Sequence, residues 1–287
     1  MGDIAHFKST DEIAWCPGCG NFGILLALKK ALVVLNKEPK DVLLCSGIGQ
    51  AAKTPHYIKC NCFNGLHGRS IPVAAAAKMA NHKLTVIVTT GDGDCYGEGG
   101  NHLIHNIRRN VDITVIVHNN QIYGLTKGQA SPMTDRGFTT KVQTHGVMLE
   151  PFHSLAVAII LGAKFVARGF SNSQDELTDL IVQGVNHRGF SLIEVLQPCV
   201  SFNKKNTAQW YAERIYRLAD EASYDPANRL QAVEKALEWG ERIPLGVFFR
   251  GEGKTYNELT GLTERPPLCE TAIEHIDIAA ALAEFAA

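Results

Sequence analysis

Short runs that are apolar along their whole length alternate with stretches of helical periodicity through most of the chain. The apolar runs are residues 42–46, 84–90, 113–118, 164–167 and 190–196. Helices are predicted over residues 21–35, 97–109, 155–162 and 174–187, with another beginning at Pro72. Strands that are apolar on both faces and alternate with helices are typical of a parallel sheet covered on both sides. The pattern therefore predicts an α/β fold with a doubly wound, mainly parallel sheet.

Charge and hydropathy exclude several classes of partner. The 287 residues include 28 Lys and Arg against 29 Asp and Glu, so neither nucleic acid nor an anionic membrane is expected to bind. No apolar run reaches the roughly 18 residues that would span a bilayer, and no secretory signal is visible. We therefore expect a cytoplasmic protein with no membrane contact.

The residues that follow Cys199 have a different pattern. Residues 203–208 are polar, 210–237 form a mixed helical stretch, and 250–267 read as loop. We expect residues 1–200 to form the main domain. Residues 201–287 are then expected to be a C-terminal arm that packs on this core or on a partner subunit.

Polar residues and glycines follow three of the predicted strands. Gly91-Asp92-Gly93-Asp94 comes directly after one strand and Asn119-Asn120 after the next, while Gly47-Ile48-Gly49 follows an earlier one. The carboxyl ends of parallel strands share one edge, where ligands bind. Glycines let the backbone approach a phosphate, and the Asp92 and Asn120 oxygens are the ligand type that Mg²⁺ prefers beside a diphosphate. Taken singly, either loop could be an ordinary connection between a strand and a helix, and this alternative is weaker for the two loops together.

The cysteines suggest a metal centre. Cys16 and Cys19 are three positions apart, and in a reducing compartment such a pair favours metal or redox chemistry over a disulfide. Thioredoxin-like chemistry lacks its usual βαβ context here, whereas zinc or an iron–sulfur cluster would need further ligands from distant loops. Packing without any metal is as well supported by the spacing alone. Isolated Cys95 and Cys269 are expected to be small hydrophobes.

Six motifs occur in an order that resembles a known family. They are the Cys16-Pro-Gly-Cys19-Gly opening, Ser46-Gly-Ile-Gly49, His67-Gly-Arg69, Gly91-Asp-Gly-Asp94, Gly99-Gly-Asn-His102 and residues 120–129. Together they resemble the β subunit of 2-oxoacid:ferredoxin oxidoreductases, especially the 2-oxoglutarate type, over residues 7–199. The resemblance implies a sheet of the thiamine-diphosphate-binding type, with thiamine diphosphate, Mg²⁺ and a 4Fe–4S cluster. It also implies an α subunit, a dimer of αβ heterodimers, coenzyme A as acyl acceptor and ferredoxin as electron partner.

The same resemblance assigns residues to the cofactor. Asp92 and Asn120 would bind Mg²⁺ through their side chains, and Ile122 through its carbonyl oxygen. The diphosphate would be held by Gly91, Gly93 and Asp94 and covered by Leu125 and Thr126.

Other matching positions would surround the reacting part of the cofactor. Gly47, Ile48, Gly49 and His67 would line the thiazolium and pyrimidine rings. His67 and Lys127 are the catalytic candidates, with Lys127 placed near the substrate carboxylate. An ordinary polar loop histidine and a solvated surface lysine are the alternatives.

The chain departs from the family pattern at one cluster ligand. Three implied ligands match Cys16, Cys19 and Cys199, but Gln50 stands where the family has a cysteine after Ser-Gly-Ile-Gly. We expect Cys60 to replace the missing thiolate because it is the first thiol in the segment that follows. Cys62 and then Cys45 are the next candidates.

The resemblance implies an enzyme that oxidatively decarboxylates 2-oxoglutarate to its acyl-CoA, or runs the reverse carboxylation. The thiazolium ring would hold the electron pair left by decarboxylation. Pyruvate or a branched 2-oxo acid is the alternative substrate. Two further alternatives are a clusterless thiamine-dependent decarboxylase or transferase, and a non-catalytic iron–sulfur or zinc module.

Overall fold

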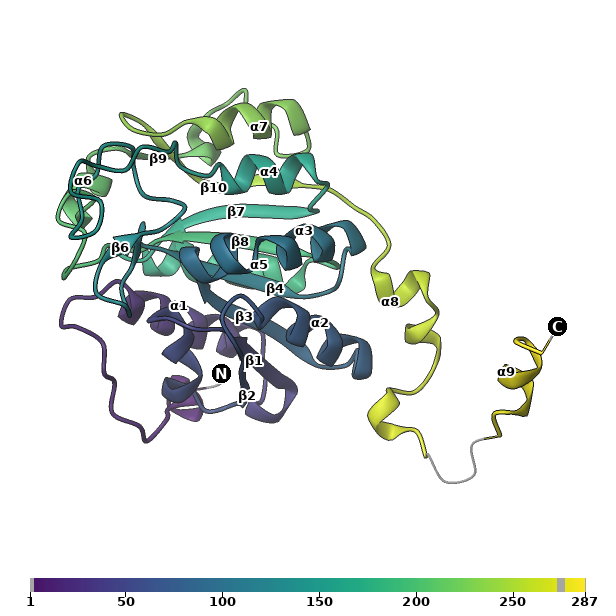
Figure 1. Cartoon of the computed structure of the whole chain (residues 1–287). Helices are drawn as coiled ribbons and strands as arrows, with labels where there is room; N and C mark the ends of the chain where they lie inside the picture. Colours follow the sequence, from purple (N-terminus) through teal and green to yellow (C-terminus); the bar gives the residue numbers. More distant parts are fainter. Residues whose placement is uncertain (1–2, 273–276, 287) are drawn as a thin grey trace.

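The computed structural model describes residues 3–272 and 277–286. An eight-stranded sheet at its centre has the order β2-β1-β3-β4-β8-β7-β10-β9 (Figure 1). Neighbouring strands from β2 to β7 are parallel. Strand β10 is antiparallel to β7 and parallel to the edge strand β9. The predicted α/β fold with a mainly parallel sheet is therefore confirmed.

The strands and helices that the sequence predicts lie within a few residues of their expected positions, and the structure contains further strands and helices that were not predicted. The strands of the large sheet are β1 (Val42–Ser46), β2 (Asn61–Asn64), β3 (Thr85–Gly91), β4 (Thr114–Asn119), β7 (Phe165–Phe170), β8 (Ser191–Leu196), β9 (Ile215–Arg217) and β10 (Ile243–Arg250). A separate hairpin pairs β5 (Ile122–Tyr123) with β6 (Gln129–Ala130). The α-helices are α1 (Asn21–Val34), α2 (Ser70–Ala80), α3 (Gly100–Arg109), α4 (Ser154–Ile160), α5 (Gln174–Asn186), α6 (Ala208–Ala212), α7 (Arg229–Leu237), α8 (Tyr256–Leu259) and α9 (Ala279–Ala283).

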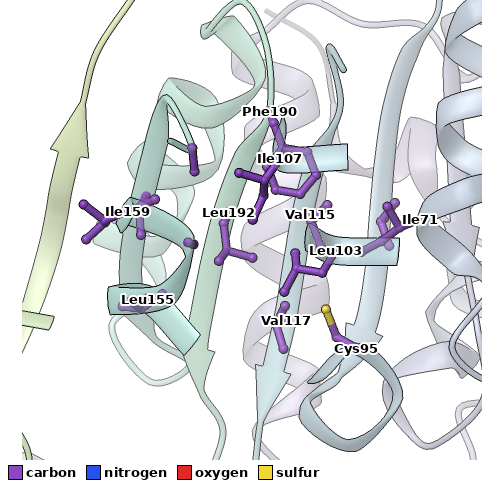
Figure 2. Packing of buried hydrophobic residues seen from close by; sticks show 14 of the residues in the cluster. Ile71, Cys95, Leu103, Ile107, Val115, Val117, Leu155, Ile159, Phe190 and Leu192 are labelled. Atoms are coloured by element: carbon purple, nitrogen blue, oxygen red, sulfur yellow. The ribbon is translucent and has the colours of Figure 1, made fainter. Parts of the chain in front are cut away.

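Helices cover both faces of the sheet, as a sheet apolar on both sides requires. Helices α1 and α5 pack against each other on one face, with α2, α3, α4 and α7 on the other. Successive side chains of β4 point to opposite faces of the sheet. Ile116 packs in the core under α1 and α5, whereas Val115 and Val117 pack in the core under α2, α3, α4 and α7. Figure 2 shows Leu103 and Ile107 of α3 lying over β4 in the core under α2, α3, α4 and α7.

The C-terminal segment contributes more to the sheet than the sequence indicates. Strands β9 and β10 extend it beyond β7, and α7 packs on α4. Pro244 and Gly246 interrupt the apolar run of β10, so the sequence pattern does not indicate a strand there. Gly246 has a left-handed φ of 115°. After β10 the chain runs away from the sheet through α8 toward α9 (Figure 1). Among the described residues, no helix is long and apolar enough to cross a membrane.

Candidate functional site: adjoining cofactor and thiol pockets

The loops that follow β1, β3 and β4 meet at the carboxyl edge of the sheet and form a pocket. Its lining residues are Ile48, Gly49, Gln50, Ala51, His67, Gly91, Asp92, Gly93, Asp94, Asn120, Ile122, Tyr123, Gly124, Leu125 and Thr126. Every residue predicted to hold the thiamine cofactor lines this pocket except Gly47. Lys127, predicted to lie near the substrate, follows the lining segment and does not belong to it.

Asp92 is one of the two buried carboxylates of this pocket, the other being Asp94. Asp92 directly follows β3 and is only 1 % exposed. Its Oδ2 accepts a hydrogen bond from the Ser131 hydroxyl at 2.5 Å, and none of the ion pairs among the described residues involves it. Burial raises the pKa of Asp92 to about 7. A bound divalent cation would keep this carboxylate ionised, so its surroundings fit a metal ligand.

Asp94 connects several loops of the pocket. Its Oδ1 accepts hydrogen bonds from the backbone N–H groups of Ile48 at 3.1 Å and Gly68 at 2.7 Å. Its Oδ2 accepts one from the Thr90 hydroxyl at 2.6 Å. A Cβ on Gly47 would lie 2.1 Å from this Oδ2, so the close approach requires glycine there. Both Asp94 oxygens are thus engaged within the protein, whereas the family resemblance implies that Asp94 helps to hold the diphosphate.

His67 lies beside the same carboxylate. Its Nδ1 is 2.8 Å from Oδ1 of Asp94 and 3.4 Å from Oε2 of Glu98. The edge of the Tyr123 ring faces the imidazole, with 6.3 Å between centroids. Because 37 % of its side chain is exposed, His67 remains accessible to a ligand in the pocket. His67 therefore lies within ion-pair distance of two carboxylates without a well-aligned hydrogen bond to either, and it is free to contact a bound molecule.

Asn120 and Ile122 share a tight turn after β4. The Asn120 Oδ1 accepts a hydrogen bond from the Ile122 N–H at 3.1 Å, and its Nδ2 donates to Oε1 of Gln197 at 3.0 Å. The intervening Gln121 has a left-handed φ of 59°, and its side chain donates to the Met133 carbonyl at 2.9 Å. These contacts fix which way the Asn120 amide faces, and a second lone pair on Oδ1 stays available for a metal ion.

The β5–β6 hairpin supplies the residues predicted to cover the diphosphate. Leu125 is 42 % exposed, and the Thr126 hydroxyl donates to Oε1 of Gln129 at 2.6 Å. Lys127 has a left-handed φ of 81° at the tip of this hairpin. A left-handed lysine is uncommon, because its Cβ crowds the backbone.

Three of the four predicted cluster cysteines meet in a second pocket. It is lined by Trp15, Cys16, Cys19, Asn21, Gln50, Asn120, Gly124, Gln197, Cys199, Val200, Ser201 and Phe202. Gln50, Asn120 and Gly124 also line the first pocket, so the two pockets are neighbours.

Each of these three sulfur atoms accepts a hydrogen bond. The donors are the Ser201 hydroxyl to Cys16 at 3.1 Å, the Gln197 amide to Cys19 at 3.4 Å and the Phe202 N–H to Cys199 at 3.4 Å. Hydrogen bonds to cysteine sulfur tune iron–sulfur clusters. Desolvation, together with the neighbouring thiols, raises the pKa of Cys19 to about 11 in the metal-free chain.

No three His, Cys, Asp or Glu side chains among the described residues converge as ligands of a single metal ion would. A cubane cluster has a different requirement, because each of its cysteines binds a separate iron atom and the thiolates need not converge on one point. Three hydrogen-bonded thiols around one pocket fit this second arrangement.

The structure does not bring Cys60 to these three thiols. Cys60 immediately precedes β2, which runs parallel to β1 with Asn61 opposite Leu43, near the start of β1. The thiol pocket contains Gln50, which lies beyond the other end of β1. Successive residues of a strand advance about 3.3 Å, so the length of β1 separates the two positions.

The two other candidates for the fourth cluster ligand also lie outside that pocket. The Sγ of Cys62 lies 3.8 Å from that of Cys60, and Cys45 is fully buried within β1. Neither lines the thiol pocket. The expected replacement of the missing thiolate by a neighbouring cysteine therefore differs from the structure, because the parallel pairing of β2 carries this segment back to the start of β1.

Several supporting residues were not singled out by the sequence. Ser131 contacts Asp92, Gln121 shapes the turn after β4, and Gln197 joins Asn120 to Cys19. Of these residues, Gln197 would have been the easiest to predict from the sequence, since it stands two residues before Cys199 at the end of a predicted strand. Ser131 is 39 positions from its partner and carried no motif.

Comparison with known proteins assigns the class. Residues 45–195 match the family described as "Thiamine pyrophosphate enzyme, C-terminal TPP binding domain". This range contains the strands and loops that form the first pocket. Residues 199–264 match the family that describes the C-terminal part of the pyruvate ferredoxin oxidoreductase beta subunit. The fold and the first pocket are thus those of a thiamine-diphosphate enzyme.

Individual relatives narrow the assignment. The chain is 44 % identical over 274 residues to "2-oxoacid:ferredoxin oxidoreductase 1, subunit beta" of Aeropyrum pernix, covering 92 % of this chain and 86 % of the relative. It is 40 % identical to "2-oxoglutarate oxidoreductase subunit KorB" of Mycobacterium tuberculosis, covering 69 % of this chain and 53 % of the relative.

A similar solved structure supports the same family assignment. It is a 2-oxoglutarate:ferredoxin oxidoreductase from Magnetococcus marinus with 2-oxoglutarate, coenzyme A and succinyl-CoA bound. The match has a TM-score of 0.90 at 30 % identity and covers 99 % of this chain and 96 % of that one. The chain belongs to the family of 2-oxoacid:ferredoxin oxidoreductase β subunits.

Proposed function

We propose that this chain is the catalytic β subunit of a 2-oxoglutarate:ferredoxin oxidoreductase. The reaction converts a 2-oxo acid and coenzyme A to the acyl-CoA, CO₂, one proton and two electrons, which pass to ferredoxin. The observation that carries the proposal is the pair of adjoining pockets, one with the buried Asp92 and the other with three hydrogen-bonded thiols. The reverse carboxylation would use the same residues.

The first pocket would hold thiamine diphosphate and Mg²⁺. The cofactor supplies a thiazolium ring that accommodates the electron pair left when the carboxylate departs as CO₂. Asp92 and Asn120 would bind the metal through side-chain oxygens, and Ile122 through its carbonyl. The burial of Asp92 supports this role, because a carboxylate removed from water needs a cationic partner to remain ionised.

The walls of the same pocket would orient the cofactor and the substrate. The remaining residues proposed to contact thiamine diphosphate are Gly47, Ile48, Gly49, His67, Gly91, Gly93, Asp94, Leu125 and Thr126. Asp94 would act mainly by holding the loops in place, since its oxygens already accept hydrogen bonds from the protein. His67 would contact the substrate or the ring end of the cofactor, and Lys127 the substrate carboxylate.

The second pocket would hold a 4Fe–4S cluster through Cys16, Cys19 and Cys199. The hydrogen bonds to all three sulfur atoms support this role. Because Gln50 and Asn120 line both pockets, the cluster and the thiamine cofactor would be neighbours. Such proximity shortens the path that electrons take toward ferredoxin.

Partner and location form part of the proposal. An α subunit would complete the substrate pocket, in a dimer of αβ heterodimers, with residues 1–200 as the cofactor domain and 201–287 packing on the core or the partner. The relatives named as β subunits support an α partner. All eight cysteines are free, which suits the reducing cytoplasm.

The deciding experiment reconstitutes the chain with its α subunit. A panel of 2-oxo acids is supplied with coenzyme A, thiamine diphosphate, Mg²⁺ and a viologen dye as electron acceptor. We expect fastest reduction with 2-oxoglutarate and little or none with the isolated β chain. Preference for pyruvate or a branched acid would change the substrate assignment. Robust turnover by the β chain alone would refute the two-subunit proposal, and failure with every acid would refute the enzyme proposal.

A further inference from the structure

Gln50 occupies the boundary between the two pockets. It belongs to both linings, and its carbonyl accepts a hydrogen bond from the Trp15 indole at 2.8 Å. That bond ties the loop after β1 to the residue preceding Cys16. A Cβ on Gly124 would lie 3.6 Å from Cγ of Gln50, so the β5–β6 hairpin also approaches this side chain. The position of Gln50 is therefore held from two directions.

The side-chain oxygen of Gln50 has no partner. Oε1 is buried, and it accepts no hydrogen bond from any described residue. A buried amide oxygen without a donor is costly, so each such atom in a folded chain calls for an explanation. Its position in a pocket with three thiols indicates that the reason is a ligand bound there.

None of the remaining cysteines is placed to bind in this pocket. Cys45, Cys60 and Cys62 are grouped by β1 and β2, where the Sγ atoms of Cys60 and Cys62 are 3.8 Å apart. Cys95 is 1 % exposed in the core beneath α3 (Figure 2). Cys269 is exposed in a short helical turn after Pro267. None of the five lines the thiol pocket.

Building on the iron–sulfur cluster of the proposed function, we propose that the chain binds the cluster through only three thiolates, with the fourth iron facing Gln50. The three thiolates come from Cys16, Cys19 and Cys199. The amide oxygen of Gln50 is an exchangeable ligand of the fourth iron, on the side toward the thiamine pocket. A neutral amide in place of a thiolate makes the site one unit less negative, which raises the reduction potential of the cluster.

This arrangement has a chemical consequence that can be measured without turnover. Ferricyanide removes one electron from a 4Fe–4S core of charge 2+, giving a core of charge 3+. An iron without a thiolate then leaves as Fe²⁺, so that a 3Fe–4S core of charge 1+ remains. Charge and iron balance in this step, and the electron ends on ferricyanide. A core held by four thiolates retains its fourth iron much more firmly.

The test uses the αβ enzyme purified without oxygen and treated with one equivalent of ferricyanide. Iron content and the electron paramagnetic resonance signal are measured. We expect the wild-type enzyme to fall from about four to about three irons per β chain and to show the signal of a 3Fe–4S cluster. Gln50→Cys should retain about four irons and have a lower midpoint potential. Gln50→Leu, which keeps a similar size but lacks the oxygen, should lose its iron faster than wild type.

Cys60→Ala and Cys95→Ala are the matched controls and should behave as wild type. Resistance of wild type to iron loss, together with reduced iron in Cys60→Ala before oxidation, would overturn the inference and leave the proposed function intact. Equal behaviour of wild type and both Gln50 variants would also overturn it. A preparation without iron in every variant, even after anaerobic reconstitution, would instead refute the cluster of the proposed function.

Discussion

The buried Asp92 should make the free energy of unfolding of the cofactor-free chain fall as the pH rises. Burial raises the pKa of Asp92 from 3.8 to about 7 in the folded chain. Between about pH 4 and pH 7 the unfolded chain releases this proton while the folded chain retains it. Stability from this group is therefore fully present below about pH 4 and declines until about pH 7. A shift of about 3 units at about 1.4 kcal/mol each amounts to about 4 kcal/mol.

Replacing Asp92 by Asn removes this titration and preserves the shape of the side chain. In EDTA at pH 8, the variant should be more stable than wild type by up to about 4 kcal/mol, and at pH 4.5 the two should differ little. Thiamine diphosphate and Mg²⁺ should reverse the order. At a cofactor concentration 100 times the dissociation constant, wild type gains about 2.7 kcal/mol, whereas the variant gains nothing if its metal site is lost.

Urea denaturation of the full chain at the two pH values, with and without cofactor, measures all of these differences. Comparing wild type with variant cancels the titration of groups that do not interact with Asp92. Asp179→Asn is the control for removing a carboxylate, because Asp179 is exposed. An identical pH slope in wild type and Asp92→Asn would refute the buried-carboxylate argument. Equal stabilisation of both by the cofactor would refute the metal assignment.

Three further substitutions test the surrounding structure. Arg168→Met should lower the free energy of unfolding by about 3–5 kcal/mol, since it leaves the fully buried Glu194 without its ion-pair partner. In the native chain the Arg168 Nε lies 3.0 Å from the Glu194 Oε1. A loss below about 1 kcal/mol would contradict this reasoning. Gln197→Leu should weaken cofactor-dependent stabilisation in thermal melts, because it removes the hydrogen bond with Asn120. It should also lower the midpoint potential of the proposed cluster, because it removes the hydrogen bond to the Cys19 sulfur. Unchanged values of both quantities would exclude a positioning role for Gln197. Gly93→Ala should reduce cofactor affinity in calorimetric titrations, because its Cβ would meet the Tyr123 ring at 2.2 Å; wild-type affinity would show that the ring moves aside freely.

The first pocket was predictable because its residues follow strands directly. Asp92 and Asn120 come immediately after apolar runs, and the shared edge of a parallel sheet then brings them together whatever the intervening sequence. The motif order supplied the family independently of that geometry. Strand ends are the positions that alternating patterns define best.

Long-range pairing explains what could not be predicted. Nothing in the sequence near Cys60 shows that β2 pairs in parallel with β1, and this pairing moves the thiol away from the thiol pocket. Strand β10 joins β7 in antiparallel fashion across 73 residues of sequence, measured from Phe170 to Ile243, with a register shift after Val247. Such contacts depend on the folded sheet and leave no local pattern.

The connections made by Asp94 determine how the cofactor pocket can move. A single carboxylate holds the end of β3, the loop after β1 and the loop before α2. These three segments can separate only if several hydrogen bonds to one charged group break together, so they behave as a rigid body on short timescales. The backbone N–H groups of Ile48 and Gly68 should accordingly exchange slowly with solvent. We therefore expect any adjustment during cofactor binding to occur in the β5–β6 hairpin, and little conformational entropy to be lost from the opposite wall.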